Sequence, residues 1–178
     1  NGVWNLRLNG KGHFNPVTVS ADVNSSLPQG LVVQVVDIPN RTIYDQFLVN
    51  GITIDDKLTE GYDMKLVAGD QQYVEETVLK ILSEIPEEFS LSQNYPNPFN
   101  PLTKMDFSLP KTGRVVITIY NLLGQEVTTL INERLSYGYH TVTWQGTDRM
   151  GRPVGSGVYF SELKAAGNRK TRKMILLK

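Results

Sequence analysis

Two histidines are the first candidates for chemistry, because an imidazole can act as a general acid or base near neutral pH. They are His13 and His140, and neither stands beside a nucleophile in a recognisable motif. Gly155-Ser156-Gly157 lacks the Gly-x-Ser-x-Gly spacing of a nucleophile elbow. The chain has no cysteine, which excludes thiol nucleophiles and thiolate zinc sites. His140 alternates within a strand-like run, so we expect it to serve packing.

Carboxylates are the second set of candidates. Two adjacent pairs, Asp55/Asp56 and Glu75/Glu76, could in principle perform acid–base chemistry. Neighbouring acids project to opposite faces of a strand, and neither pair lies in a recognisable motif, so we expect solvated surface. Asp148 could hold calcium together with backbone carbonyls, but one carboxylate is far below the usual ligand count, and a turn-stabilising role is expected. These residues predict a non-catalytic chain with no cofactor and no metal.

Charge is balanced overall and divided unevenly along the chain. Residues 1–86 hold 6 Lys/Arg and 11 Asp/Glu, whereas residues 87–178 hold 12 and 7. Solvated surface explains this distribution, and the alternative is a basic half that meets an acidic partner or an anionic surface. The same two interpretations apply to the basic cluster at residues 169–173. Nucleic acid is not expected as a partner, because aromatic residues do not interleave with the basic ones.

Apolar and polar residues alternate over most of the chain, which is typical of half-buried strands. Before residue 70 the expected strands span residues 4–8, 17–23, 31–37, 43–49, 52–54 and 62–68. Asn50-Gly51 predicts a hairpin between two of them. The pattern then changes to helical spacing between Asp70, a candidate N-cap, and Pro86. These features predict a β-sandwich over residues 1–69 and a helical linker over residues 70–88.

Residues 94–101, Asn-Tyr-Pro-Asn-Pro-Phe-Asn-Pro, contain three prolines and two aromatic residues. Proline fixes its own φ and disfavours helix at the preceding residue, so an extended segment is expected, with Tyr95 and Phe99 seating it against the fold. About seven further strands follow, ending with residues 158–165 and 173–178. The apolar residues 174–177 should insert between neighbours and leave Lys173 and Lys178 exposed. This half therefore predicts a second sandwich.

The motifs of the second half occur in a particular order. The segment at residues 93–101 is followed by Ile-Tyr-Asn-Leu-Leu-Gly-Gln at residues 119–125, and then by Trp144, Asp148 and Gly151. Ser-Gly-Val-Tyr at residues 156–159 and Lys-Met-Ile-Leu-Leu-Lys at residues 173–178 complete the series. With these motifs, residues 89–178 resemble the type A C-terminal sorting domain of the bacterial type IX (Por) secretion system. They also resemble the related immunoglobulin-like domain of the flagellar hook-cap protein.

The resemblance implies a fold and a function. The expected fold is all-β, with two immunoglobulin-like sandwiches joined by a short helix and the proline-rich extended segment. The expected function is a sorting and cell-surface anchoring signal on a secreted protein. Its implied partners are the outer-membrane components of type IX secretion, surface lipopolysaccharide and an upstream catalytic or adhesive domain. The implied location is secreted or on the outer-membrane surface, reached through the periplasm.

The resemblance also assigns roles to residues. It implies that Gly157, Tyr159, Lys173 and Lys178 are recognised by the secretion machinery. It further implies a structural role for the remaining motif residues: Asn94, Tyr95, Pro96, Asn97, Pro98, Phe99, Asn100, Pro101, Gly124, Trp144, Asp148 and Gly151. A binding or adhesion module for carbohydrate or protein, or a structural spacer, is the alternative function, because aromatic residues such as Trp4 and Tyr120 could line a sugar-binding face.

Overall fold

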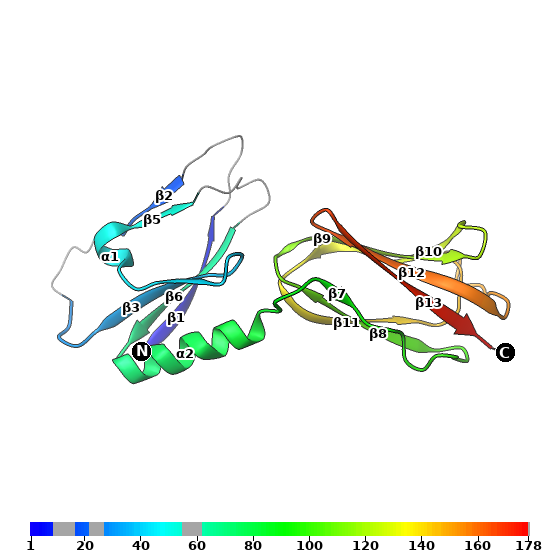
Figure 1. Ribbon diagram of the computed structural model, residues 1–178, viewed down its shortest axis with the longest axis horizontal. Coiled ribbons are helices and arrows are strands. Elements are labelled where there is room, and N and C mark those ends of the chain that lie inside the picture. Colours follow the sequence, from blue (N-terminus) through cyan, green and yellow to red (C-terminus); the bar gives the residue numbers. More distant parts are fainter. Residues whose placement is uncertain (9–16, 22–26, 55–61, 178) are drawn as a thin grey trace. The chain divides into compact units, whose positions relative to one another are not determined.

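The computed structural model describes residues 1–8, 17–21, 27–54 and 62–177 (Figure 1). The chain divides into two compact units, Asn1–Ile85 and Pro86–Lys178. Strands make up most of the regular structure in both units, which confirms the expected all-β class. In the described ranges, neither helix combines the length and the apolar character that a membrane span requires.

The first unit contains a four-stranded antiparallel sheet and a two-stranded one. The order in the larger sheet is β1-β6-β3-β4, and β2 pairs with β5. The strands are β1 (Gly2–Leu8), β2 (Val17–Val19), β3 (Val32–Asp37), β4 (Thr42–Tyr44), β5 (Ile52–Ile54) and β6 (Tyr62–Gly69). Buried residues of both sheets, including Val35, Ile52, Ile54 and Met64, form one apolar cluster. The two sheets therefore share a core.

The expected strand over residues 43–49 and the hairpin at Asn50-Gly51 are wrong. A strand forms only in Thr42–Tyr44, and the chain then makes one helical turn, α1 (Phe47–Asn50). The N–H of Gly51 donates to the Phe47 carbonyl, with φ at +65°. A hairpin turn and the end of a helix both favour glycine with positive φ. Gly51 therefore fits the end of α1 as well as it would have fitted the expected hairpin. Burial of Phe47, which is 3% exposed, holds the turn against the core.

The expected helix forms as α2 (Gln71–Glu84), and Asp70 caps it by accepting a hydrogen bond from the Tyr73 N–H at 2.9 Å. Its buried residues are Val74, Val78 and Ile81. The helix contacts β6 and β3, so it is packed onto the first unit as well as leading to the second. The boundary between the units follows it, at Ile85 and Pro86.

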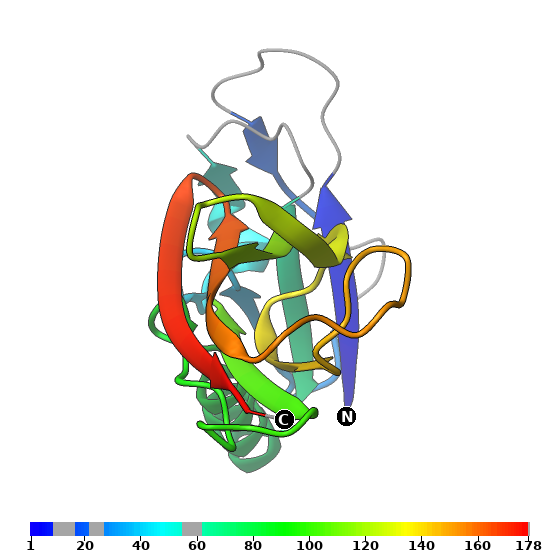
Figure 2. The ribbon, with the colours of Figure 1, turned by 90° about the vertical axis from the view of Figure 1, so that its right-hand side faces the viewer.

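The second unit is a sandwich of two antiparallel sheets, with strand orders β10-β9-β12-β13 and β11-β8-β7. Figure 2 shows β13, in red, beside β12, in orange. The strands are β7 (Ser90–Leu91), β8 (Thr103–Leu109), β9 (Gly113–Asn121), β10 (Glu126–Leu135), β11 (Gly138–Trp144), β12 (Gly157–Ala165) and β13 (Asn168–Leu176). One apolar cluster fills the space between the sheets, with Phe107, Ile117, Leu163 and Met174 among its buried members. Alternation along each strand sends every second side chain into this core.

Candidate functional site

The last strand, β13, forms an antiparallel hairpin with β12, and this hairpin brings most of the expected recognition residues together. Gly157 lies opposite Leu176, Tyr159 lies opposite Met174, and Phe160 lies opposite Lys173. Lys173 is exposed, as expected. Lys178 lies outside the described residues.

Residues 174–177 are only partly buried, which differs from the expected insertion of the whole run. Met174 and Leu176 are each 0% exposed, whereas Leu177 is 51% exposed. The cause is the alternation of a strand whose sheet has one buried face, so that Lys173, Ile175 and Leu177 face away from the core.

The outer edge of β13 is covered by the proline-rich segment. The Phe99 N–H donates to the Ile175 carbonyl at 3.0 Å, and the Leu177 N–H donates to the Phe99 carbonyl at 2.9 Å. The Asn97 side chain accepts a hydrogen bond from the Ile175 N–H at 3.0 Å, and the Gln93 amide donates to the Lys173 carbonyl at 2.7 Å. Proline cannot donate to a sheet, so the side chain of Asn97 and the backbone of Phe99 make these bonds instead.

The proline-rich segment folds back onto the second unit and differs from the straight extended segment that its prolines suggested. The Tyr95–Pro96 and Asn97–Pro98 peptide bonds are cis. Asn94, which is 2% exposed, donates to the Pro96 carbonyl and to Oγ1 of Thr103, both at 2.9 Å. Thr103 Oγ1 in turn donates to the Pro96 carbonyl at 2.9 Å. A closed polar network therefore fixes the bend inside the unit.

An aromatic cluster lies beneath this segment. The ring of Phe99 is 5.5 Å from that of Trp144, and Trp144 meets Tyr159 edge-on at 5.1 Å. The indole N–H of Trp144 donates to the Thr147 carbonyl, and the Tyr159 hydroxyl donates to the Gly155 carbonyl at 2.8 Å. Burial raises the pKa of the Tyr159 hydroxyl. Phe99 thus seats the segment as expected, whereas Tyr95 does not, because it is 81% exposed.

The loop before β12 is held by Asp148. Its Oδ1 accepts from the backbone N–H groups of Met150 and Arg152 at 2.9 and 3.0 Å, and its Oδ2 accepts from Nε of Arg152 at 2.9 Å. The hydrogen bond from the Arg152 side chain, followed by those from the backbone, lowers the pKa of Asp148. Gly151 completes the turn by donating to the Asp148 carbonyl. These are the contacts that a turn-stabilising aspartate makes.

The turn between β9 and β10, at residues 121–125, is also held by the side chain of its first residue. The Asn121 side chain accepts hydrogen bonds from the N–H groups of Leu123 and Gln125, both at 3.0 Å. Gly124, with φ at +75°, donates to the Asn121 carbonyl. The adjacent leucines, Leu122 and Leu123, are 70% and 81% exposed. The sequence motif therefore combines a rigid turn with two apolar side chains held in solvent.

The remaining candidates for chemistry that the structure describes lie on separate elements. His140 stacks on Phe107 at 5.2 Å between ring centres, with Nε2 2.8 Å from the Ser136 carbonyl. Glu75 and Glu76 accept hydrogen bonds from Gln71 and Gln72 on the exposed side of α2. His13, Asp55 and Asp56 lie outside the described residues. In residues 1–8, 17–21, 27–54 and 62–177, no group of three or more acidic or histidine side chains could hold a metal ion.

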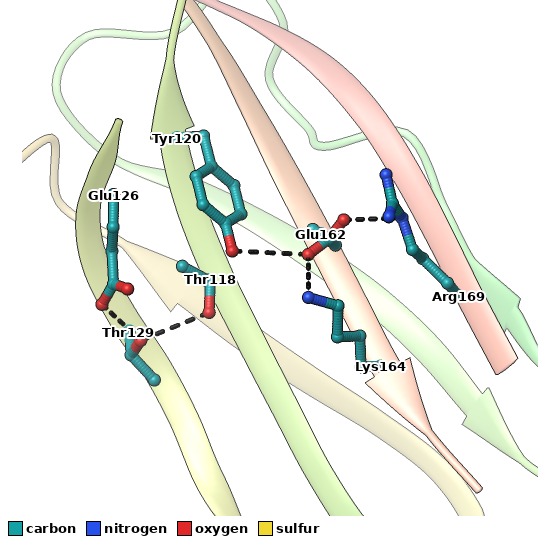
Figure 3. Close-up of polar contacts among 7 residues, drawn as sticks. All are labelled: Thr118, Tyr120, Glu126, Thr129, Glu162, Lys164 and Arg169. Carbon is teal, nitrogen blue, oxygen red and sulfur yellow. Dashed lines mark hydrogen bonds and ion pairs between the residues drawn. The ribbon is translucent and has the colours of Figure 1, made fainter. Parts of the chain in front are cut away.

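Two buried polar residues of the second unit, Thr103 and Glu162, hold neighbouring groups in place although no sequence motif pointed to them. Thr103 joins the network under the proline-rich segment and is fully buried. Glu162 is 7% exposed on β12 and forms ion pairs with Lys164 and Arg169 at 2.6 and 2.7 Å (Figure 3). The sequence carried one signal for Glu162, an acid within the mostly apolar run at residues 158–163 that is followed by a lysine two residues later.

The comparison with protein-family models gives a match within the second unit. Residues 102–168 match the FlgD Ig-like domain family. No curated protein matches the chain.

Similar solved structures include PorZ, described as an essential surface component of the type IX secretion system of Porphyromonas gingivalis (17% identity, 52% of this chain and 12% of that one, TM-score 0.36). They also include FlgD from P. aeruginosa (21% identity, 42% of this chain and 59% of that one, TM-score 0.35). A third is dimeric latent PorU from Porphyromonas gingivalis (16% identity, 85% of this chain and 13% of that one, TM-score 0.42). Each of these proteins extends well beyond the part that is matched. The finding that assigns a domain type is thus the match of residues 102–168 to the FlgD Ig-like domain.

Proposed function

We propose that residues 89–178 are a C-terminal sorting and cell-surface anchoring signal that the type IX secretion machinery recognises. In this proposal the first unit is an accessory, non-catalytic domain, and any activity belongs to a domain upstream. The protein reaches the outside through the periplasm, where outer-membrane components of the machinery bind its last strand. Surface lipopolysaccharide is the proposed site of attachment.

The convergence of the motif residues on β13 carries the proposal. Asn97 and Phe99 hydrogen-bond its outer edge, Gly157 and Tyr159 pair with its inner edge, and Trp144 supports both through its ring contacts. The motifs that resemble a sorting signal in sequence thus lie together around β13 in the folded unit.

The covered edge also indicates how recognition would work. At residues 175–177 the backbone of β13 is already bonded on its outer side by residues 97–99, so a partner cannot add a strand there without displacing them. The side chains that face away from the core remain available. We therefore propose that the machinery reads Lys173 and its exposed neighbours, and that Lys178 also takes part in recognition.

The test separates recognition from folding. Met174 and Leu176 should each stabilise the unit by roughly 1.5–3 kcal/mol through burial. Exposed charges contribute only about 0–1 kcal/mol. A Lys173→Ala, Lys178→Ala double variant should therefore keep the melting temperature of the parent chain and lose export. Lys170→Ala is the matched control, because Lys170 is exposed on the same hairpin and lies opposite Leu163, on the other face.

The assay fuses a fluorescent reporter to the N-terminus of the whole chain in a bacterium that has the machinery. The expected result is surface fluorescence for the parent chain and for Lys170→Ala, and periplasmic fluorescence for the double variant. Retention of the parent fusion in the periplasm, while an established sorting domain reaches the surface, contradicts the proposal. An equal loss of export in the control would show that net charge, and not Lys173 and Lys178, is recognised.

A further inference from the structure

A hollow lies on the outer face of the sheet formed by β10, β9, β12 and β13. Its volume is about 430 Å³, and its lining includes Tyr120, Leu122, Phe160, Glu162, Lys164 and Arg169. On β12, Phe160, Glu162 and Lys164 point away from the core, because Tyr159, Ser161 and Leu163, which alternate with them, face it. Tyr120 lies opposite Phe160 and Arg169 lies opposite Lys164, so both share that outer face. The hollow thus belongs to the opposite face of the sheet from the aromatic cluster around Trp144.

The charged side of the hollow is built around Glu162. Figure 3 shows Lys164 and Arg169 converging on its carboxylate, with the Tyr120 hydroxyl 3.4 Å from the same group. Arg169 reaches Glu162 through Nε, and 68% of its side chain is exposed; Lys164 is 51% exposed. One buried anion therefore fixes two cations in place and neutralises only one of them. The guanidinium is oriented and still faces solvent, which suits it to bind a carboxylate.

The apolar side of the hollow comes from neighbouring strands and from the turn after β9. Phe160 lies directly opposite Tyr120 in the strand register, and both are half-buried. Leu122 extends this surface and is 70% exposed. The turn is rigid because Asn121 bonds two of its backbone N–H groups, so Leu122 is held in solvent by the fold. An apolar group of a ligand would gain burial here without ordering the turn.

The charge of the surroundings selects the ligand. Residues 157–177 contain five Lys/Arg and one Glu, whereas residues 86–156 contain six of each sign. The positive charge of the second unit is therefore concentrated on the hairpin that borders the hollow. A neutral glycan would not use this charge. A flat anionic membrane would meet this charge without filling a hollow of about 430 Å³.

We propose that this hollow binds a short acidic peptide segment of a partner protein, with an apolar side chain against Phe160, Tyr120 and Leu122 and a carboxylate on Arg169. The inference does not rest on the proposed sorting function, because it concerns binding by the purified chain. Its failure and a failure of export are therefore separate outcomes.

The experiment measures fluorescence anisotropy of a labelled peptide in which glutamate alternates with leucine, titrated with the full chain. The structure offers two matched pairs of variants. Leu122→Ser removes an apolar side chain that lines the hollow, and Leu123→Ser removes its exposed neighbour in the same turn, which does not line it. Arg169→Gln removes a cation of the hollow, and Lys170→Gln removes the next one along β13, which lies on the other face.

Saturable binding of the peptide is expected, and it should weaken in about 1 M salt, where charges are screened beyond about 3 Å. Arg169→Gln should weaken binding by about two- to fivefold, which corresponds to the loss of one exposed ion pair, and Lys170→Gln should change it less. Leu122→Ser should weaken binding, and Leu123→Ser should not. Thermal unfolding of each variant verifies that the fold is intact.

Three results would overturn the proposal. The first is equal binding of a peptide in which lysine replaces glutamate. The second is equal weakening by both members of either pair in folded variants. The third is binding to vesicles of anionic lipid, or to a neutral oligosaccharide, without any binding to the acidic peptide.

Discussion

Replacing Phe99 with alanine should lower the free energy of unfolding of the second unit by about 3–5 kcal/mol, the usual cost of removing a fully buried phenylalanine side chain. Phe99 is 2% exposed, and its ring packs 5.5 Å from that of Trp144. Its two hydrogen bonds to β13 use the backbone N–H and carbonyl, which alanine retains. The substitution therefore removes the ring and leaves the bonds that cover the strand edge.

Tyr95→Ala is the matched control, because Tyr95 is the other aromatic residue of the proline-rich segment. Its side chain is 81% exposed, and its backbone exchanges hydrogen bonds of 2.8 and 2.9 Å with Lys104, which alanine also retains. Surface substitutions of this kind change stability by about 0.5 kcal/mol or less. The two variants remove similar rings from one short segment, so their difference measures burial.

The assay is equilibrium unfolding in urea, followed by tryptophan fluorescence in a Trp4→Phe background. Trp4 belongs to the first unit and is 52% exposed, whereas Trp144 is 1% exposed, so the remaining signal reports unfolding of the second unit. Far-UV circular dichroism provides an independent midpoint. Equal losses in the two variants, or a loss below about 1 kcal/mol for Phe99→Ala, would refute the assignment of Phe99 as the buried anchor.

Three further predictions concern the same unit. Gly146→Ala should cost about 1–2 kcal/mol in urea unfolding, because residue 146 has φ at +65° and a Cβ there would lie 3.3 Å from Leu176 and from the Pro101 carbonyl. Tyr159→Phe should cost about 0.5–1.5 kcal/mol in the same assay through loss of the bond to Gly155. The pKa of Asp148 is lower in the folded chain than its value of about 3.9 in the unfolded chain, so its ionised form stabilises the fold at pH values above about 4. The stability advantage of the parent chain over Asp148→Asn should therefore shrink as the pH falls below about 4.

Periodicity predicted the second unit well because its strands have one buried and one exposed face. Val115, Ile117 and Ile119 alternate in the sequence, and all three are fully buried on β9. The first unit contains the clear failure, at residues 43–49. There Phe47 anchors a helical turn, and the turn signal of Gly51 fits two different structures. A local pattern could not decide between them, because the choice depends on which strand pairs with β5, and that partner is β2.

The site was only partly predictable. The exposure of Lys173 could be anticipated from the sequence, because the residues that follow it at 174–177 are all apolar and Lys173 is charged. The pairing of the proline-rich segment with β13 could not, because Asn97 and Ile175 are 78 positions apart and no local pattern connects them. The difference between Tyr95 and Phe99 was hidden for the same reason. Both are aromatic residues in one motif, and only the tertiary fold determines which of them is buried.

The covered edge of β13 also has a consequence for the timing of folding. The first segment of the second unit and its last strand bind each other directly, through Arg172 and the Leu91 carbonyl and through Phe99 and Leu177. The sandwich can therefore close only after the ribosome has delivered residue 177, whereas the first unit has all its strands by residue 69. During synthesis the second unit therefore stays open for longer than the first, and its unclosed strands are accessible to chaperones in that interval.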